Sequence, residues 1–147
     1  MTPVHRTARI VLLSVLGLLA AGCEPAIDAS ADIEERLVGT WQRDYEESGT
    51  RVRRILVLEP GGRFRETSRT LGPQEPGTVH AHEGEWLFDG TNLKRRYTLM
   101  DGKRPAAPTV PFAAFQIAFQ GPHAFTGTDN VRRRELSYRR VSDGTQP

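Results

Sequence analysis

The stretch 85-EWLFDGTNLKRRYTLMDG-102 decides the fold class, because it holds two extended segments and two turns. The first segment, Glu85–Phe88, ends at Asp89-Gly90, and the second, Asn92–Met100, ends at Asp101-Gly102. An Asp-Gly pair between two segments of alternating polarity is a strong signal for a β-hairpin. The stretch therefore predicts antiparallel strands that are joined by tight turns.

The same pattern of extended segments and short turns continues on both sides of this stretch. Glycine and proline recur too often for long helices, and apolar residues repeat at every second position. The other predicted strands are Leu37–Arg43, Arg53–Leu58, Arg63–Thr70, Thr78–His82, Val110–Gln120, Ala124–Thr128 and Arg132–Val141, with a bulge at Gly84. About eight strands with short turns are typical of all-β proteins. We expect an antiparallel meander barrel.

The first residues carry a different pattern, which is typical of a secretion signal. His5, Arg6 and Arg9 precede the apolar run Ile10–Ala21, which is too short for a mature membrane-spanning helix. The run ends in Leu-Ala-Ala-Gly-Cys at residues 19–23, which resembles the lipobox of bacterial lipoproteins. The resemblance implies cleavage between Gly22 and Cys23 and a lipid on the Cys23 thiol. The alternative is an ordinary secretory signal with a chance cysteine.

Cys23 is the only cysteine, so a mature lipoprotein retains no disulfide, thiolate metal site or cysteine nucleophile. The chain has 20 Lys and Arg against 18 Asp and Glu, and the predicted signal contains two arginines and no acid. The mature chain is then formally neutral, and we expect no nucleic-acid partner. Glu24 follows the cysteine, where the family rule links aspartate to inner-membrane retention. The predicted location is the periplasmic face of the outer membrane, which the protein contacts through its lipid.

The predicted organisation has four parts. Residues 1–22 are the signal peptide, and residues 23–36 are a lipid-anchored tether with one helical turn at Ile33–Arg36 and Asp32 as its N-cap. Residues 37–141 are the barrel domain, and residues 142–147 are a disordered tail.

Several short motifs of the barrel domain resemble the small lipocalin-like domains of bacterial lipoproteins. In these domains a Gly-x-Trp opens the first strand, a second Gly-x-Trp opens a middle strand, and a strand with Tyr-Arg closes the barrel. The matching residues are Leu37-Val38-Gly39-Thr40-Trp41, Gly61-Gly62-Arg63-Phe64, Gly84-Glu85-Trp86, Asn92-Leu93 and Leu136-Ser137-Tyr138-Arg139-Arg140-Val141.

The physical roles of these residues agree with the resemblance. Gly39 allows a close approach of the backbone below Trp41, which plugs one end of the barrel. Tyr138 and Arg140 share a face of the last strand, whereas Arg139 lies on the outer face. An inward Arg140 needs a partner, and an indole ring is a good one. The resemblance implies the same contact, because a late arginine of lipocalins packs over the tryptophan of the first strand.

His80 and His82 are the candidates for a metal site, because residues two apart on a strand share a face. No third or fourth ligand is identifiable, so the alternative of two solvated histidines is preferred, and we expect no metal. Basic runs at Arg51-Arg53-Arg54, Lys94-Arg95-Arg96 and Arg132-Arg133-Arg134 are candidates for an anionic-lipid patch. Their preferred interpretation is solvated strand faces.

Large apolar residues are candidates either to fill the barrel or to line a ligand cavity. Phe115, Ile117 and Phe119 share one face of the longest apolar segment, and Phe64 is a further lining candidate. The other large residues are Trp86, Phe88, Tyr97, Phe112 and Phe125. We prefer core filling, because a small domain needs most of these residues for its stability.

The sequence contains no catalytic motif, and we expect neither enzymatic activity nor a cofactor. Two function classes remain. One is a membrane-anchored barrel that binds a small apolar or amphiphilic molecule. The alternative is a non-catalytic envelope accessory protein with a filled core.

Overall fold

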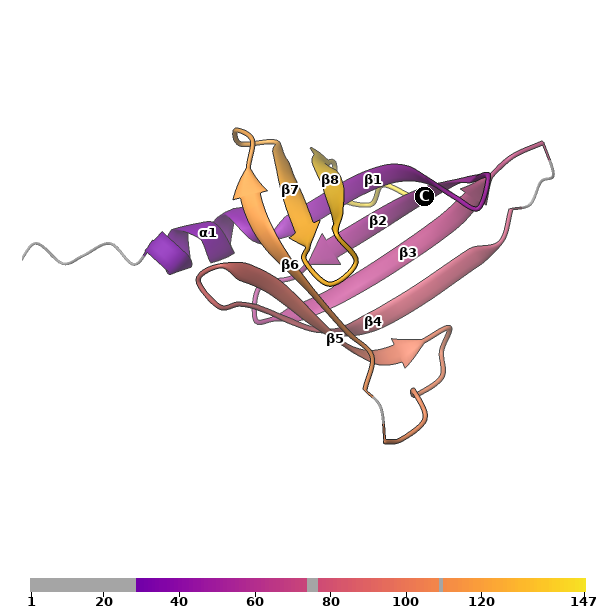
Figure 1. Ribbon diagram of the computed structural model, residues 1–147, viewed down its shortest axis with the longest axis horizontal. Coiled ribbons are helices and arrows are strands. Elements are labelled where there is room, and N and C mark those ends of the chain that lie inside the picture. The colour runs from indigo at the N-terminus through magenta and orange to yellow at the C-terminus, as the bar shows by residue number, and fades with distance from the viewer. Residues whose placement is uncertain (1–28, 74–76, 109) are drawn as a thin grey trace, which may run out of the picture.

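The computed structural model of the protein describes residues 29–73, 77–108 and 110–147. The predicted signal peptide, Cys23 and the first part of the tether lie outside the described residues. The described chain is one helix followed by a closed antiparallel barrel (Figure 1). Its elements are α1 (Ala29–Leu37), β1 (Gly39–Glu47), β2 (Thr50–Leu58), β3 (Arg63–Leu71), β4 (Val79–Phe88), β5 (Asn92–Met100), β6 (Phe112–Phe119), β7 (Ala124–Asp129) and β8 (Arg134–Val141). The predicted all-β meander barrel is confirmed.

Each strand pairs with its neighbours in sequence, and β8 closes the barrel against β1. Trp41 lies opposite Arg140 in this last pairing and opposite Leu56 in the β1–β2 pairing. Because paired residues point to the same side of a sheet, these three side chains all point into the barrel. Closure leaves no unpaired edge at the first and last strands.

The strand bounds differ from the predicted ones mainly at β1 and β2. These two strands extend to a tight turn at Ser48-Gly49, where both residues have positive φ, as a type I′ hairpin requires. Thr78–His82 and Glu85–Phe88 form one strand, β4, and the β4–β5 register shifts between Glu83 and Gly84. The irregularity predicted at Gly84 is therefore present.

Helix α1 is longer than the predicted turn at Ile33–Arg36. Asp32 is not its N-cap but lies in its first turn, where its carboxylate is 3.9 Å from the Arg36 guanidinium. Leu37 ends the helix instead of opening a strand, and its side chain is fully buried. Among the described residues, no helix combines the length and hydropathy that a membrane crossing requires.

The barrel has two different ends. The closed end carries α1 and the β2–β3, β4–β5 and β6–β7 turns, and the open end carries the other four connections (Figure 1). The apolar core, most of which lies in the closed half, consists of Leu37, Trp41, Leu56, Leu58, Phe64, Trp86, Leu93, Phe115, Phe125, Leu136 and Tyr138. Phe112, one of the predicted large residues, is instead 58% exposed near the open end.

The last residues differ from the predicted disordered tail. The structure places 142–147 beside the outer face of β1 and β2, where Asp143 accepts a 2.7 Å hydrogen bond from the Thr40 hydroxyl. A second bond joins the Thr145 hydroxyl to the Ser142 carbonyl oxygen. These contacts help to bury the outward-facing side of β1.

Candidate functional site

The closed end is built around Trp41 and Arg140. The indole Nε1 donates to the Leu37 carbonyl oxygen over 2.7 Å, and the Arg140 guanidinium carbon lies 4.3 Å from the Trp41 ring centroid. Arg140 also donates to the carbonyl oxygens of Val38 and Arg36 over 2.9 and 2.5 Å. The contact between Arg140 and Trp41 is the one that the sequence predicts. The Trp41 and Arg140 side chains both have hydrogen-bond partners in this end of the barrel. The closed end is a structural plug.

Gly39 serves this plug in a way that the sequence did not specify. Its φ is +133°, and a Cβ at this position would lie 2.2 Å from Arg140 Nη1. The missing side chain therefore makes room for the arginine rather than for the indole ring. Tyr138 stacks on Phe125 with ring centroids 4.9 Å apart, and Trp86 Nε1 donates to the Glu59 carbonyl oxygen over 3.0 Å.

The histidine candidates lie together near the open end. His80 Nδ1 is 2.9 Å from Asp101 Oδ2, and the His80 and His82 rings are 6.3 Å apart. Among the described residues, no group of three His, Cys, Asp or Glu side chains is placed to hold a metal ion.

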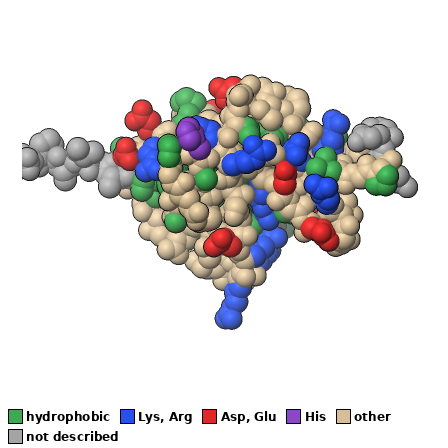
Figure 2. All heavy atoms as spheres, turned by 90° about the horizontal axis from the view of Figure 1, so that it is seen from above, with side chains coloured by type: hydrophobic (Ala, Val, Ile, Leu, Met, Phe, Trp, Pro, Cys, Tyr) green, Lys and Arg blue, Asp and Glu red, His purple; other side chains and the backbone are tan. Residues whose placement is uncertain are grey.

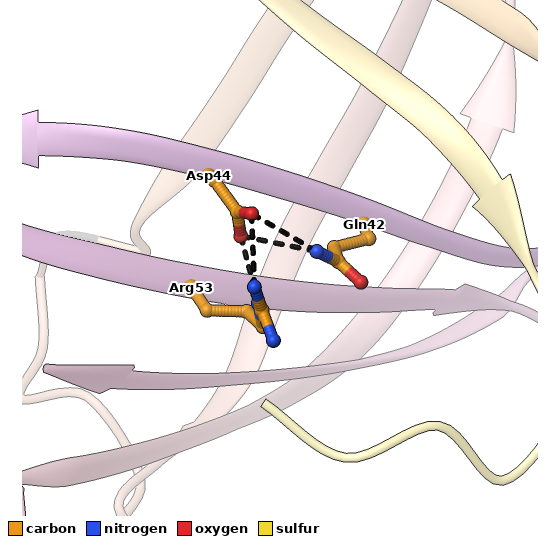
Figure 3. Close-up of polar contacts among 3 residues, drawn as sticks. All are labelled: Gln42, Asp44 and Arg53. Carbon is orange, nitrogen blue, oxygen red and sulfur yellow. Dashed lines mark hydrogen bonds and ion pairs between the residues drawn. The ribbon is translucent and has the colours of Figure 1, made fainter. Parts of the chain in front are cut away.

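The basic runs divide between the two faces of the barrel. Arg53 points outward and forms a two-bond ion pair with Asp44, which also accepts from Gln42 (Figure 3). The hydrogen bond from Arg53 lowers the pKa of Asp44. On the face shown in Figure 2, basic, acidic and apolar side chains are interspersed. The interpretation as solvated strand faces holds for residues such as Arg53 and fails for Arg54 and Arg95.

Arg54 and Arg95 point into the barrel and meet Glu66 there. We call these three residues the lumen cluster. Arg95 Nη1 donates to Glu66 Oε2, and Arg54 Nε lies 3.6 Å from Glu66 Oε1. Arg95 is 1% exposed and Glu66 is 2% exposed. The prediction that the Lys94-Arg95-Arg96 run is solvated is wrong for Arg95, because strand alternation turns it inward between Leu93 and Tyr97.

The opposite charges of Glu66 and the two arginines stabilise the ionised form of each group in the lumen cluster. Burial alone would raise the pKa of Glu66, but the charges of Arg95 and Arg54 and the hydrogen bond from Arg95 bring it below its ordinary value. Burial would lower the pKa of Arg95, but the charge of Glu66 outweighs it and the pKa is raised. The cluster is therefore ionised at neutral pH, with two positive charges and one negative charge.

Five buried side-chain polar atoms of the described residues have no hydrogen-bond partner: Arg54 Nε, Arg69 Nε, Arg95 Nε, His82 Nδ1 and the Tyr138 hydroxyl. All except that of Arg69, which lies opposite the outward-facing Arg53, belong to the inward-facing set of their strands. A buried polar group without a partner costs about 1–3 kcal/mol, and more if it is charged. Most buried polar groups of native proteins have a partner, so this concentration marks the open half as the candidate site.

A pocket of about 310 Å³ opens onto two of these residues, Arg54 and Arg95. Arg54 and Arg95 lie in its wall, together with Tyr97 and Phe115. The mouth is formed by Glu47, Met100, Pro111, Phe112, Ala113, Arg132 and Arg134. The pocket thus has a cationic wall and an apolar wall, which is the arrangement of a site for a molecule with one polar and one apolar end.

A larger groove of about 630 Å³ lies outside the barrel, between residues 143–147 and the outer face of β1–β3. None of the described buried polar atoms that lack a partner belongs to its lining. The lumen pocket is therefore the better candidate site, although it is smaller.

The predicted lining residues separate between the two halves of the barrel. Phe115 lines the pocket, and Phe64 lies behind it, with its ring centroid 5.4 Å from the Arg95 guanidinium carbon. Ile117 and Phe119 pack against the core of the closed half. The sequence analysis named Arg54 and Arg95 only as members of basic runs for an anionic-lipid patch, and it did not name Glu66 as a site residue. The available signal was alternation, which already placed Glu66 on the same face as Phe64.

Compared with known protein families and with curated proteins, the chain matches none.

Proposed function

We propose that the protein is a lipid-anchored envelope protein whose barrel binds a small amphiphile at its open end. The observation that carries the proposal is the pair of unpaired buried atoms, Arg54 Nε and Arg95 Nε, in two residues that lie in the wall of the pocket. A ligand with acceptor atoms would satisfy these groups. The role is that of a binding protein rather than an enzyme.

The closed end supports the lipocalin-like part of the proposal. Arg140 packs over Trp41 and Gly39 leaves room for it, which is the arrangement that the resemblance implies. A barrel of about eight strands has an interior wide enough for side chains or one small ligand. Here side chains fill the closed half, and the ligand would occupy the open half.

The proposed anchor gives the barrel a direction relative to the membrane. Helix α1 begins at Ala29 on the closed-end side of the barrel (Figure 1), and Cys23 lies six residues earlier. Six residues span at most about 20 Å. A lipid on Cys23 would hold the closed end near the outer membrane and leave the open end facing the periplasm.

Native mass spectrometry tests the binding function. The full chain carrying Cys23→Ser is purified and analysed before and after solvent extraction. We expect a co-purifying amphiphile that extraction removes. A protein that is empty and also fails to enhance the emission of fluorescent fatty-acid probes would contradict the proposal.

Labelling with radioactive palmitate tests the anchor separately. We expect label in the wild-type protein and none in the Cys23→Ser variant, because the chain has no other thiol. Equal labelling of the two proteins, or an unlabelled wild type, would contradict lipidation at Cys23.

A second candidate function is an accessory role that uses the outer surface. Phe112, Val110 and Leu87 are each more than half exposed and come from β4, β6 and the segment before β6. This exposure favours a protein contact at that side of the barrel. Crosslinking of the lipidated protein in intact cells, with Leu87→Asp as the disrupting variant, tests it.

A further inference from the structure

We infer that the ligand of the lumen pocket is a carboxylate amphiphile that binds head first, with its carboxylate between Arg54 and Arg95 and its tail leaving over Met100 at the mouth. The inference rests on the proposed binding function and specifies the charge and the direction of the ligand. It follows from the charge balance, the free donors and the position of the apolar wall.

The charge balance of the pocket favours an anion. Its lining contains the four arginines Arg54, Arg95, Arg132 and Arg134, and the single acid Glu47 at the rim. Arg132 and Arg134 have a partner in Asp129, at 3.3 and 3.6 Å. Arg54 and Arg95 share only Glu66. These two arginines therefore carry one positive charge more than Glu66 balances, and Arg43, opposite Arg54 in the β1–β2 pairing, adds to it. An uncompensated charge becomes more unfavourable as it is buried.

The free donors define where the anion binds. Arg95 is almost fully buried and uses Nη1 for Glu66, which leaves its Nε unpaired. Arg54 donates from Nη2 to the Tyr45 hydroxyl over 2.9 Å, and its Nε is also unpaired. Guanidinium groups bind carboxylates through charge-assisted hydrogen bonds, which are about twice as strong as neutral ones. A ligand carboxylate between the two arginines would satisfy both donors.

The position of the apolar wall sets the direction of the tail. Trp41, Leu56 and Leu136 are at most 1% exposed, so the closed half has no room for a hydrocarbon chain. The apolar surface that remains is at the mouth, where Met100, which lies opposite the inward-facing His82, is 36% exposed. A tail that leaves through the mouth would cover this side chain. The reverse orientation would place hydrocarbon against the guanidinium groups and leave their donors unpaired.

The size of the pocket agrees with a partly enclosed ligand. Its volume of about 310 Å³ lies at the lower end of the range of about 300–1,000 Å³ for small-molecule sites. The carboxylate and the first part of the tail would be enclosed, and the rest would lie on the mouth. Dodecanoate is therefore a suitable probe.

Calorimetric titration compares dodecanoate with dodecanol, dodecyltrimethylammonium and butanoate on the full chain carrying Cys23→Ser. We expect dodecanoate to bind at least tenfold more tightly than the other three. Dodecanol lacks the charge, the ammonium has the wrong charge, and butanoate lacks the tail. Equal affinities for dodecanoate and dodecanol would overturn the inference while leaving the binding function intact. Binding of none of the four would contradict the binding function itself.

Variants locate the carboxylate. Arg54→Gln is expected to weaken dodecanoate binding at least tenfold without changing dodecanol binding. The matched control is Arg53→Gln, on the next residue but on the outer face, which should change neither affinity.

Glu66→Gln should tighten dodecanoate binding, because it removes the competing carboxylate. Thermal melts establish that each variant is folded, and Arg54→Lys replaces Arg54→Gln if the latter unfolds, with a smaller loss expected. An unchanged dodecanoate affinity in the folded Arg54 variant would overturn the assignment.

Variants at the mouth test the direction. Met100→Ala should weaken dodecanoate and leave butanoate unchanged, whereas Phe112→Ala, on the outer face opposite Arg96, should affect neither. Dodecanoate affinity that is insensitive to Met100→Ala would overturn the head-first orientation.

Discussion

The two halves of the barrel are built from the same eight strands but bury opposite kinds of side chain. In the closed half Trp41, Leu56 and Leu136 are at most 1% exposed, and the inward-facing Arg140 has carbonyl and aromatic partners. In the open half Arg95 and Glu66 are buried to the same extent, but the arginine Nε atoms have no partner.

This difference separates stability from function. Apolar burial stabilises the folded chain by about 25 cal/mol per Å². A buried ion pair contributes little or nothing net, because desolvation offsets the attraction. The closed half therefore explains why the barrel folds, and the open half retains groups that a purely structural core would not need.

The largest effect is expected at the centre of the closed half. Trp41→Ala should destabilise the barrel by about 3–5 kcal/mol, since it leaves a large cavity and removes the hydrogen bond to Leu37. That loss is comparable to the whole stability of a small domain. Urea unfolding measures it. A change below about 1 kcal/mol would mean that the closed half is not the main source of stability.

Arg95→Met should have the next largest effect, about 3 kcal/mol, because it leaves Glu66 buried with only the more distant Arg54 as a partner. The comparison variant is Arg96→Met, on the neighbouring outer position of β5, where both partners of the ion pair with Glu85 are more than half exposed. That exposed pair should contribute at most about 1 kcal/mol. Similar urea midpoints for the two variants would contradict the buried role of Arg95.

Within the closed half, the inward Arg140 can be compared with the outward Arg139. Arg140→Ala should cost about 2–3 kcal/mol, because two carbonyl oxygens and the Trp41 ring lose their partner. Arg139→Ala, on the outer face, should change stability by less than about 0.5 kcal/mol. Equal denaturant midpoints would reject the inward position of Arg140.

The smallest effect is the pH dependence of the lumen cluster. The pKa of Glu66 is lowered in the folded chain, so its contribution to stability is present above its unfolded pKa of about 4.3 and is lost as the pH falls through the folded value. Below about pH 4 the stability of the wild type should therefore approach that of Glu66→Gln. Urea midpoints measured from pH 7 to pH 3 test this. Curves that stay parallel would show that Glu66 is not ionised in the fold.

The sequence predicted the closed half better than the open half, and the reason is physical. Alternation turned Arg140 inward, and the resemblance to lipocalin-like domains implied its contact with Trp41. Arg54 and Arg95 lie in runs of basic residues, where charge favours the interpretation as solvated surface. Only the alternation of side chains along the strand turns these two arginines inward, and their positive charge favoured the opposite prediction.

Other features were not accessible from the sequence at all. Glu66 is on β3 and Arg95 is on β5, two strands that are not neighbours. Their contact crosses the barrel interior and depends on closure and register. Helix α1 was underestimated, because Ala29–Ala31 also has the composition of a tether.

The most direct test of the account is a double replacement, Glu66→Leu with Arg95→Met, measured for both urea stability and dodecanoate binding. Apolar replacement of a buried ion pair is often neutral or stabilising by about 1–4 kcal/mol. Arg54 would keep the Tyr45 hydroxyl and some access to solvent, since 23% of its side chain is exposed. We predict unchanged or higher stability and loss of dodecanoate binding. A variant that is strongly destabilised, or that folds and still binds dodecanoate as the wild type does, would contradict the claim that the lumen cluster serves binding rather than folding.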